Sequence, residues 1–133
     1  MAEFASFISS EEFRKIHPIR RAAYIHHQFT FIHPFVDGNG RTARLLMNHE
    51  LMSAGYPYIS IKVADRLSYY RVLDEASKGD ILEFERFITE TMATTLDLYL
   101  DCTMRAKSGQ QIDDRSENPS KINENYYRDT IEL

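Results

Sequence analysis

Residues 33–44, which read HPFVDGNGRTAR, contain most of the side chains whose types and spacing could carry out chemistry. A histidine is followed four positions later by a carboxylate, then by a Gly-Asn-Gly turn and two arginines three residues apart. A glycine-rich turn that leads into a helix gathers backbone N–H groups at the positive end of the helix dipole. The segment therefore predicts an anion site. Its candidate residues are His33, Asp37, Gly38, Asn39, Gly40, Arg41 and Arg44.

These residue types together predict phosphoryl or nucleotidyl transfer. A histidine can act as a general base near neutral pH, and one carboxylate can hold Mg²⁺ together with substrate phosphates. Arginines bind phosphate oxygens through two parallel hydrogen bonds. The segment is not a P-loop, because the chain lacks the pattern G-x-x-x-x-G-K-[ST] and the glycines follow a predicted helix rather than a strand.

Two predicted helices position this segment. Pro18 suits the first turn of a helix over roughly 18–32, which brings the chain to His33, and Pro34 then forces a break. A loop over 34–39 leads to a second helix over about 40–54, which Gly55 ends. We expect this second helix to be largely buried. Its expected core residues are Leu45, Leu46, Leu51 and Met52.

The rest of the chain predicts further helices and at most a short β element. We expect a ragged terminus over residues 1–8 and a short helix that begins at residues 9–12. Residues 58–63 alternate like a strand but have no partner strand, so they are expected to be extended or a loop. The fold class is therefore all-α. Its other expected elements are a helix over 65–77, a long helix over 81–105, a linker over 106–119 and a last helix over 120–131.

Side chains outside the segment receive simpler interpretations. Phe84, Phe87 and Tyr99 are expected in the core, and Cys102 is expected to be a thiol packed between helices. For the remaining histidines, packing or surface positions are favoured over zinc binding, because adjacent histidines on a helix point about 100° apart. These histidines are His17, His26, His27 and His49.

The bulk properties limit the function classes. The 133 residues suggest one domain, and the net charge of −4 argues against nonspecific binding to nucleic acid. A single cysteine excludes an internal disulfide and a multi-cysteine metal site. We expect no membrane partner, because no apolar run approaches the roughly 18–20 residues of a span. The N-terminal region also lacks the layout of a signal peptide, so we expect a cytoplasmic location.

The segment 33–44 resembles the signature of the Fic family, H-P-F-x-D/E-G-N-G-R-x-x-R, at every fixed position. The resemblance implies a small all-helical Fic core, here residues 1–105, with the motif loop between two central helices. It also implies transfer of AMP from ATP to a Ser, Thr or Tyr hydroxyl of a target protein, with pyrophosphate leaving (AMPylation). The similarity covers roughly residues 17–101. Its further matches are 26–29, 45–48, 54–57, 69–70 and 79–80.

The same resemblance implies a role for each residue of the catalytic end of the motif. His33 would be the general base that takes the proton of the target hydroxyl. Asp37 would hold Mg²⁺ that bridges the α- and β-phosphates of ATP. The anion hole would be formed by Gly38, Asn39 and Gly40.

The resemblance to the Fic family also implies which residues bind the nucleotide. Arg41 would contact the phosphates, and Arg44 would bind the γ-phosphate. In the related Doc kinases a lysine stands at the place of Gly38 and ATP binds in a reversed sense, so the glycine favours AMP transfer over phosphorylation. Tyr69 or Tyr70 would line the adenine pocket.

A second family pattern concerns control. Many Fic proteins carry an inhibitory helix with the motif [S/T]-x-x-x-E-[G/N], and residues 120–125, SKINEN, fit it. By resemblance, Glu124 would pair with Arg44 and deny ATP its productive pose. An ordinary helix that Ser120 caps is the alternative interpretation.

One feature departs from the family. Its members usually have further helices and a β-hairpin flap that docks the target before the motif helix, and residues 1–17 predict no hairpin. We therefore expect a fragment, or a minimal or rearranged member. A de-AMPylase that uses the same site and a catalytically silent Fic-type regulatory domain remain alternatives. A homodimer is compatible with the family, in which control through dimerisation is common.

Overall fold

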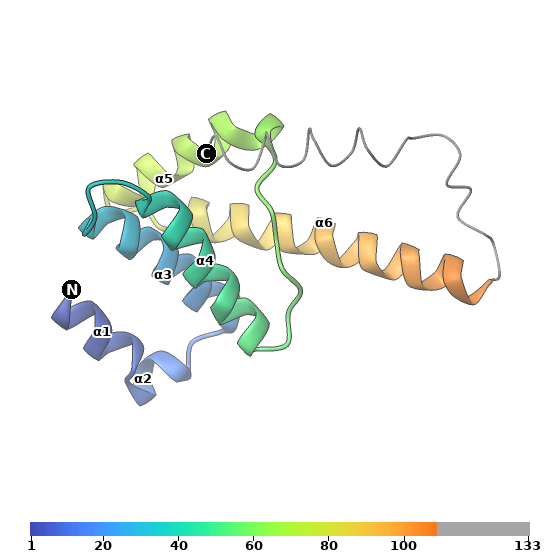
Figure 1. Cartoon of the computed structure of the whole chain (residues 1–133), viewed down its shortest axis with the longest axis horizontal. Coiled ribbons are helices and arrows are strands. Elements are labelled where there is room, and N and C mark those ends of the chain that lie inside the picture. Colours follow the sequence, from blue (N-terminus) through green and yellow to red (C-terminus); the bar gives the residue numbers. More distant parts are fainter. Residues whose placement is uncertain (109–133) are drawn as a thin grey trace.

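The computed structural model describes residues 1–108, which form six α-helices and no β-strand, so the predicted all-α class is confirmed (Figure 1). The predicted end of the linker and the last helix, with Ser120 and Glu124, lie outside the described residues. The elements in chain order are α1 (Ala2–Ile8), α2 (Glu11–Arg14), α3 (Pro18–Ile32), α4 (Asn39–Ser53), the 3-10 turn η1 (Val63–Asp65), α5 (Arg66–Ser77) and α6 (Leu82–Lys107).

The first eight residues form helix α1, so the prediction of a ragged terminus was wrong. Phe4 is buried, and the ring of Phe7 packs edge-on against Phe13 and Tyr24 with centroids 5.3 Å from each. Tertiary burial of these rings outweighs the weak helical tendency of a short segment. The predicted serine cap of α2 is present, because the hydroxyl of Ser10 accepts a hydrogen bond from the N–H of Phe13.

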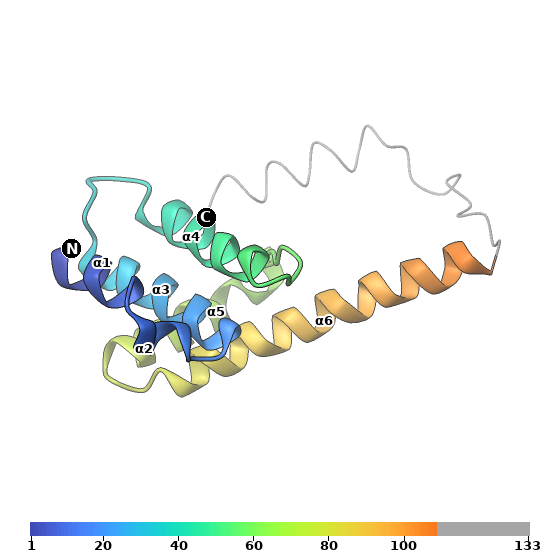
Figure 2. The ribbon, with the colours of Figure 1, turned by 90° about the horizontal axis from the view of Figure 1, so that it is seen from below.

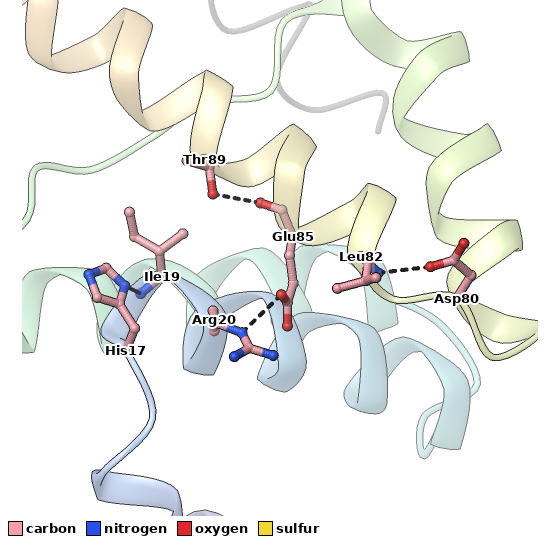
Figure 3. A network of polar contacts seen from close by, with 7 residues as sticks. All are labelled: His17, Ile19, Arg20, Asp80, Leu82, Glu85 and Thr89. Atoms are coloured by element: carbon pink, nitrogen blue, oxygen red, sulfur yellow. Dashed lines mark hydrogen bonds and ion pairs between the residues drawn. The ribbon is translucent and has the colours of Figure 1, made fainter.

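Helix α3 begins and ends where the sequence predicts. Pro18 occupies its first position, and Nδ1 of His17 accepts a hydrogen bond from the N–H of Ile19 at 3.3 Å (Figure 3). One residue further, Arg20 donates from Nε to the carboxylate of Glu85 on α6 at 3.0 Å. This contact ties the start of α3 to the first turns of α6.

Helix α4 lies beside α3 in both views, and its buried face differs from the predicted one (Figures 1 and 2). Ala43, Met47 and Leu51 are fully buried at four-residue spacing. Leu45 and Met52, which the sequence places in the core, are 67% and 52% exposed. That prediction was wrong because Ala43, Met47 and Leu51 share the face of the helix that packs into the core, and Leu45 and Met52 point away from it.

Two clusters of buried apolar side chains hold the helices together. The larger joins α3, α4, α5 and α6 with part of the segment after α4, and the smaller joins α1, α2, α3 and α4. Helices α3 and α4 therefore contribute to both clusters. The loop that connects them, residues 33–38, is held at both ends by well-packed helices.

Helix α6 buries side chains only in its first half, up to Met92, and its second half projects beyond the bundle (Figures 1 and 2). Phe84 is in the core and Phe87 packs against it, as predicted. The core position of Tyr99 and the packed thiol of Cys102 were wrong, because both residues are exposed. Neither this helix nor another in residues 1–108 is long and apolar enough to span a bilayer.

The segment over residues 58–62 forms neither a helix nor a strand, in agreement with the predicted extended segment or loop, and η1 begins at Val63. Its backbone is fastened by the buried side chain of Asn48 on α4. The amide oxygen accepts from the N–H of Ile59 at 2.9 Å, and the amide nitrogen donates to the carbonyl of the same residue at 3.0 Å. This clamp sets the path of the chain towards α5.

Candidate active site

His33 terminates α3 in a left-handed backbone conformation, with φ 51° and ψ 56°. Its N–H still donates to the carbonyl of Phe29 at 3.1 Å, so the residue closes the last turn of the helix. The following Pro34 disfavours a right-handed helical conformation at His33. Left-handed backbone is uncommon for a residue other than glycine, and it marks the place where the chain leaves α3.

The contact of the His33 imidazole with Thr30 favours one tautomer. Its Nδ1 lies 3.4 Å from the carbonyl oxygen of Thr30, and a carbonyl can only accept. A hydrogen bond here requires the proton on Nδ1, and in the neutral ring the lone pair is then on Nε2. The side chain is exposed at the loop, which suits a group that takes a proton from a second molecule.

Asn39 fixes the shape of the loop after His33. Its buried amide accepts from the N–H of Phe35 at 3.0 Å and donates to the carbonyl of Phe35 at 2.7 Å. The side chain therefore clamps the loop onto the first turn of α4. Any contribution of Asn39 to an anion site comes from its backbone N–H.

The N-terminus of α4 has the geometry of an anion site. Gly38 is its N-cap with φ 83°, and no side chain of residues 1–108 caps this end of the helix. The first N–H groups of a helix have no partners within the helix, so here they are available to a ligand. A Cβ at Gly38 would lie 3.4 Å from the Arg41 guanidinium and would also strain the backbone. The conformation therefore favours glycine at this position, whereas a Cβ would make only an ordinary contact with the flexible end of Arg41.

Asp37 is the carboxylate next to this helix end. One of its oxygens accepts from the N–H of Gly38, and the other lies 3.4 Å from the guanidinium of Arg41. Its side chain is 91% exposed. Within residues 1–108 no group of three metal-binding side chains occurs. A lone exposed carboxylate fits the mode in which Mg²⁺ takes one protein ligand and completes its shell with phosphates and water.

A cavity of about 420 Å³ brings all the candidate residues of 33–44 together with α5. This volume lies within the range of small-ligand sites. Three further residues line the cavity that sequence analysis did not single out, namely Thr30, Val36 and Leu73. The predicted residues on its wall are His33, Asp37, Gly38, Asn39, Gly40, Arg41, Arg44, Tyr69 and Tyr70.

The sequence is similar to known proteins that have the same motif. A family model described as "Fic/DOC family" matches residues 1–51, which include the whole motif. "Protein adenylyltransferase Fic" of Drosophila persimilis is 50% identical over 103 residues, which make up 77% of this chain and 20% of that protein. The chain is therefore similar to the Fic/DOC family over its motif and most of its described residues. It spans about a fifth of the length of the curated relatives it matches.

Solved structures support the same Fic core. The chain superposes on Fic-1 (residues 134–508) from C. elegans with a TM-score of 0.77 and 34% identity, over 79% of this chain and 32% of that one. A Fic domain containing signaling protein from Bacteroides thetaiotaomicron gives a TM-score of 0.72 and 30% identity, over 85% of this chain and 47% of that one.

The two tyrosines beside the Fic motif face different environments. Tyr69 is 1% exposed, so its ring is enclosed in the core, whereas Tyr70 is 44% exposed at the cavity. Burial raises the pKa of Tyr69, which the charge and hydrogen bond of Arg44 partly offset. The Tyr69 hydroxyl also lies 3.0 Å from Nε2 of His26. The ring of Tyr70 is thus exposed at the cavity, whereas the hydroxyl of Tyr69 makes a polar contact with His26 in the interior.

His26 is a packing residue, as predicted, and lies fully buried on α3. Burial lowers its pKa from 6.5 to about 3, with smaller contributions from the charges of Arg44 and His27. His26 binds a proton more readily in the unfolded chain than in the folded chain. The stabilisation that depends on its neutral ring is therefore complete above pH 6.5. It is lost as the pH falls towards 3, by up to about 1.4 kcal/mol per pH unit.

We therefore expect the free energy of unfolding to decrease between pH 7 and pH 4.5, and His26→Gln to flatten this dependence. Urea titrations at several pH values measure the two slopes. Burial also lowers the pKa of His27. The stability of the His26→Gln variant therefore keeps part of its dependence on pH. An identical slope in wild type and His26→Gln would contradict the assignment, and the exposed His49 gives the control variant His49→Gln.

Proposed function

We propose that this chain transfers AMP from ATP to a Ser, Thr or Tyr hydroxyl of a target protein. The observation that carries the proposal is a cavity whose lining includes His33, Asp37 and the N-terminus of α4. A base, an anion-binding helix end and a carboxylate are the groups that nucleotidyl transfer requires. The names of the adenylyltransferase relatives support the same activity.

The reaction follows from the positions of these groups. Nε2 of His33 takes the proton of the target hydroxyl as its oxygen bonds to the α-phosphorus of ATP. The bond from that phosphorus to the pyrophosphate oxygen breaks, and pyrophosphate leaves. The N–H groups at the start of α4 stabilise the charge on the phosphate oxygens. Asp37 would hold Mg²⁺, which neutralises phosphate charge when bound.

The nucleotide is then bound by three further side chains. Arg41 and Arg44 lie on one side of α4 and on the cavity wall, where they contact the phosphates, with Arg44 at the γ-phosphate. We assign the adenine to Tyr70, because its ring is exposed to the cavity and that of Tyr69 is not. The guanidinium of Arg66 lies 5.7 Å from the Tyr70 ring centroid and supports this ring from α5.

Self-inhibition by the C-terminal residues is part of this proposal. The pattern of Ser120 and Glu124 in the sequence and the place of Arg44 in the cavity support it. Glu124 would pair with Arg44 and exclude the γ-phosphate, so that ATP loses its productive pose.

The test is incubation of the full chain with α-labelled or γ-labelled ATP, followed by autoradiography of the chain and of added candidate targets. We expect label from the α position only, increased by Glu124→Gly and unchanged by Glu117→Gly, which removes a carboxylate from the same stretch. Label from the γ position would show a kinase instead.

The remaining outcomes separate the alternatives. ATP binding without label from Glu124→Gly would indicate a silent regulatory domain. Release of AMP from a pre-AMPylated target would indicate a de-AMPylase. Equal labelling by wild type and Glu124→Gly would contradict self-inhibition while leaving AMP transfer in place.

A further inference from the structure

Val36 is a fully exposed apolar side chain on the wall of the cavity. It follows His33 by three positions in the loop between α3 and α4, and it lines the cavity together with His33 and Asp37. Its relative exposure is 105%, so the rest of residues 1–108 covers essentially none of it. Single exposed apolar residues are common on protein surfaces. The place of this one, on the same loop and cavity wall as the base, gives it a possible partner.

The loop holds this side chain in a fixed place. Before Val36, the N–H and the carbonyl of Phe35 both bond to the side chain of Asn39, and the Phe35 ring lies 5.9 Å from that of Phe29, between centroids. After Val36, the carboxylate of Asp37 accepts from the next backbone N–H at 2.6 Å. The backbone is therefore fastened on both sides of Val36. A partner that covers the side chain does not have to order the loop.

The nucleotide does not account for this exposed side chain. Phosphates are attracted to the part of the cavity wall where the first N–H groups of α4 lie with the guanidinium groups of Arg41 and Arg44. The ring to which we assign the adenine, that of Tyr70, belongs to α5. A valine side chain offers a phosphate neither charge nor a hydrogen-bond donor. The polypeptide that carries the acceptor hydroxyl is the other molecule that must enter the cavity.

This polypeptide has to pass close to Val36. Its hydroxyl must reach Nε2 of His33, and three residues of chain span at most about 11 Å, so the Cα atoms of His33 and Val36 lie within that distance. In an extended polypeptide, the residues one and two positions from the hydroxyl lie about 3.4 and 7 Å away along the chain. A flanking side chain of the target is therefore within reach of Val36. If it is apolar, their contact removes apolar surface of both from water.

We propose that Val36 is a specificity-determining residue that favours target segments in which a large apolar side chain lies next to the modified hydroxyl. The inference rests on the proposed function for the identity of the acceptor. Val36 contacts the target and not the reacting atoms. A charged side chain at the same place in the target loses hydration against the valine and gains no partner in return.

The test uses synthetic peptides in which one Ser, Thr or Tyr is flanked on both sides by Leu, by Glu or by Lys within a Gly-rich sequence. Transfer from α-labelled ATP is measured with the full chain that carries Glu124→Gly. We expect kcat/KM for the Leu peptide to exceed that for the Glu peptide about tenfold, the order of effect of one partly buried apolar contact. The ratio between peptides is decisive, because a change in ATP affinity or in the amount of folded protein affects both peptides equally.

Variants at position 36 test the contact itself. Val36→Ala should reduce the preference for the Leu peptide, and Val36→Lys should reverse it, because the introduced cation attracts the flanking acid. The matched control is Leu98→Lys, which should leave the preference unchanged. Leu98 is 60% exposed on the second half of α6, at the other end of the molecule from the loop (Figures 1 and 2). Equal kcat/KM for the Leu, Glu and Lys peptides, or one and the same preference in all variants, would overturn the inference.

The outcomes also separate this inference from the proposed function. Label from the α position on the chain or on added proteins, without a difference between the peptides, contradicts the inference alone. Label from the γ position only, with a preference that follows the residue at position 36, contradicts AMP transfer alone. Absence of label from either position on every peptide contradicts the inference, and absence of label on every protein as well contradicts both.

Discussion

His33→Ala is expected to reduce AMP transfer by about 10²–10⁴-fold, the usual contribution of a general base. The contact of Nδ1 with the carbonyl of Thr30 favours the tautomer in which Nε2 has the lone pair that takes the proton. Alanine has no group that can take the proton of the hydroxyl. Transfer of α-label in the Glu124→Gly background measures the loss, while calorimetry should show that ATP still binds.

The backbone at His33 calls for a second variant. Its φ of 51° is unfavourable for alanine by roughly 1–2 kcal/mol, so a structural effect could accompany the chemical one. Asparagine tolerates left-handed backbone better and carries no base, so His33→Asn should keep the fold and lose the activity. His49→Ala, at an exposed position of α4, is the histidine control. Full activity of His33→Asn would contradict the assignment of the base.

The helices around the site could be predicted because local signals specify them. Pro18 at the start of α3, Pro34 after its end and Gly55 after α4 act on the backbone of their own neighbours. The motif is also contiguous, so its residues come together in any fold that makes the loop. Sequence alone therefore predicted both the helices and most of the cavity wall.

Burial that depends on distant neighbours could not be predicted in the same way. Phe4 orders α1 through contacts with other helices, and Tyr99 is exposed because no described element packs against the second half of α6. The spacing of apolar residues along the sequence is the same whether a helix face is packed against other helices or exposed.

The contact between Tyr69 and His26 has the same origin. Tyr69 and His26 are 43 positions apart, and neither the spacing nor the residue types indicate that they meet. The interpretation of His26 as a packing residue from the sequence is confirmed. The association of Tyr69 or Tyr70 with the nucleotide comes from the family resemblance and stays a prediction. Only the arrangement of α3 and α5 brings these two side chains together in the core.

Asn39→Ala is expected to lower both the stability and the activity, and the activity more strongly. The clamp on Phe35 supplies one acceptor and one donor, at 3.0 and 2.7 Å. Its removal leaves two part-buried backbone groups without these partners, at a cost of about 2 kcal/mol. The loop then no longer holds His33 opposite the start of α4, and misplacement of reacting groups costs on the order of 10²-fold in rate.

Asn48 provides a matched control for this prediction, because it makes the same pair of hydrogen bonds to a single residue from the same helix. It clamps Ile59 after α4, whereas Asn39 clamps Phe35 before it. Asn48→Ala should therefore lower the Tm at least as far as Asn39→Ala, since its partner is buried. Its rate of AMP transfer, measured well below both Tm values, should stay near that of wild type. Equal losses of rate in the two variants would show that general destabilisation, and not the shape of the catalytic loop, explains the effect of Asn39.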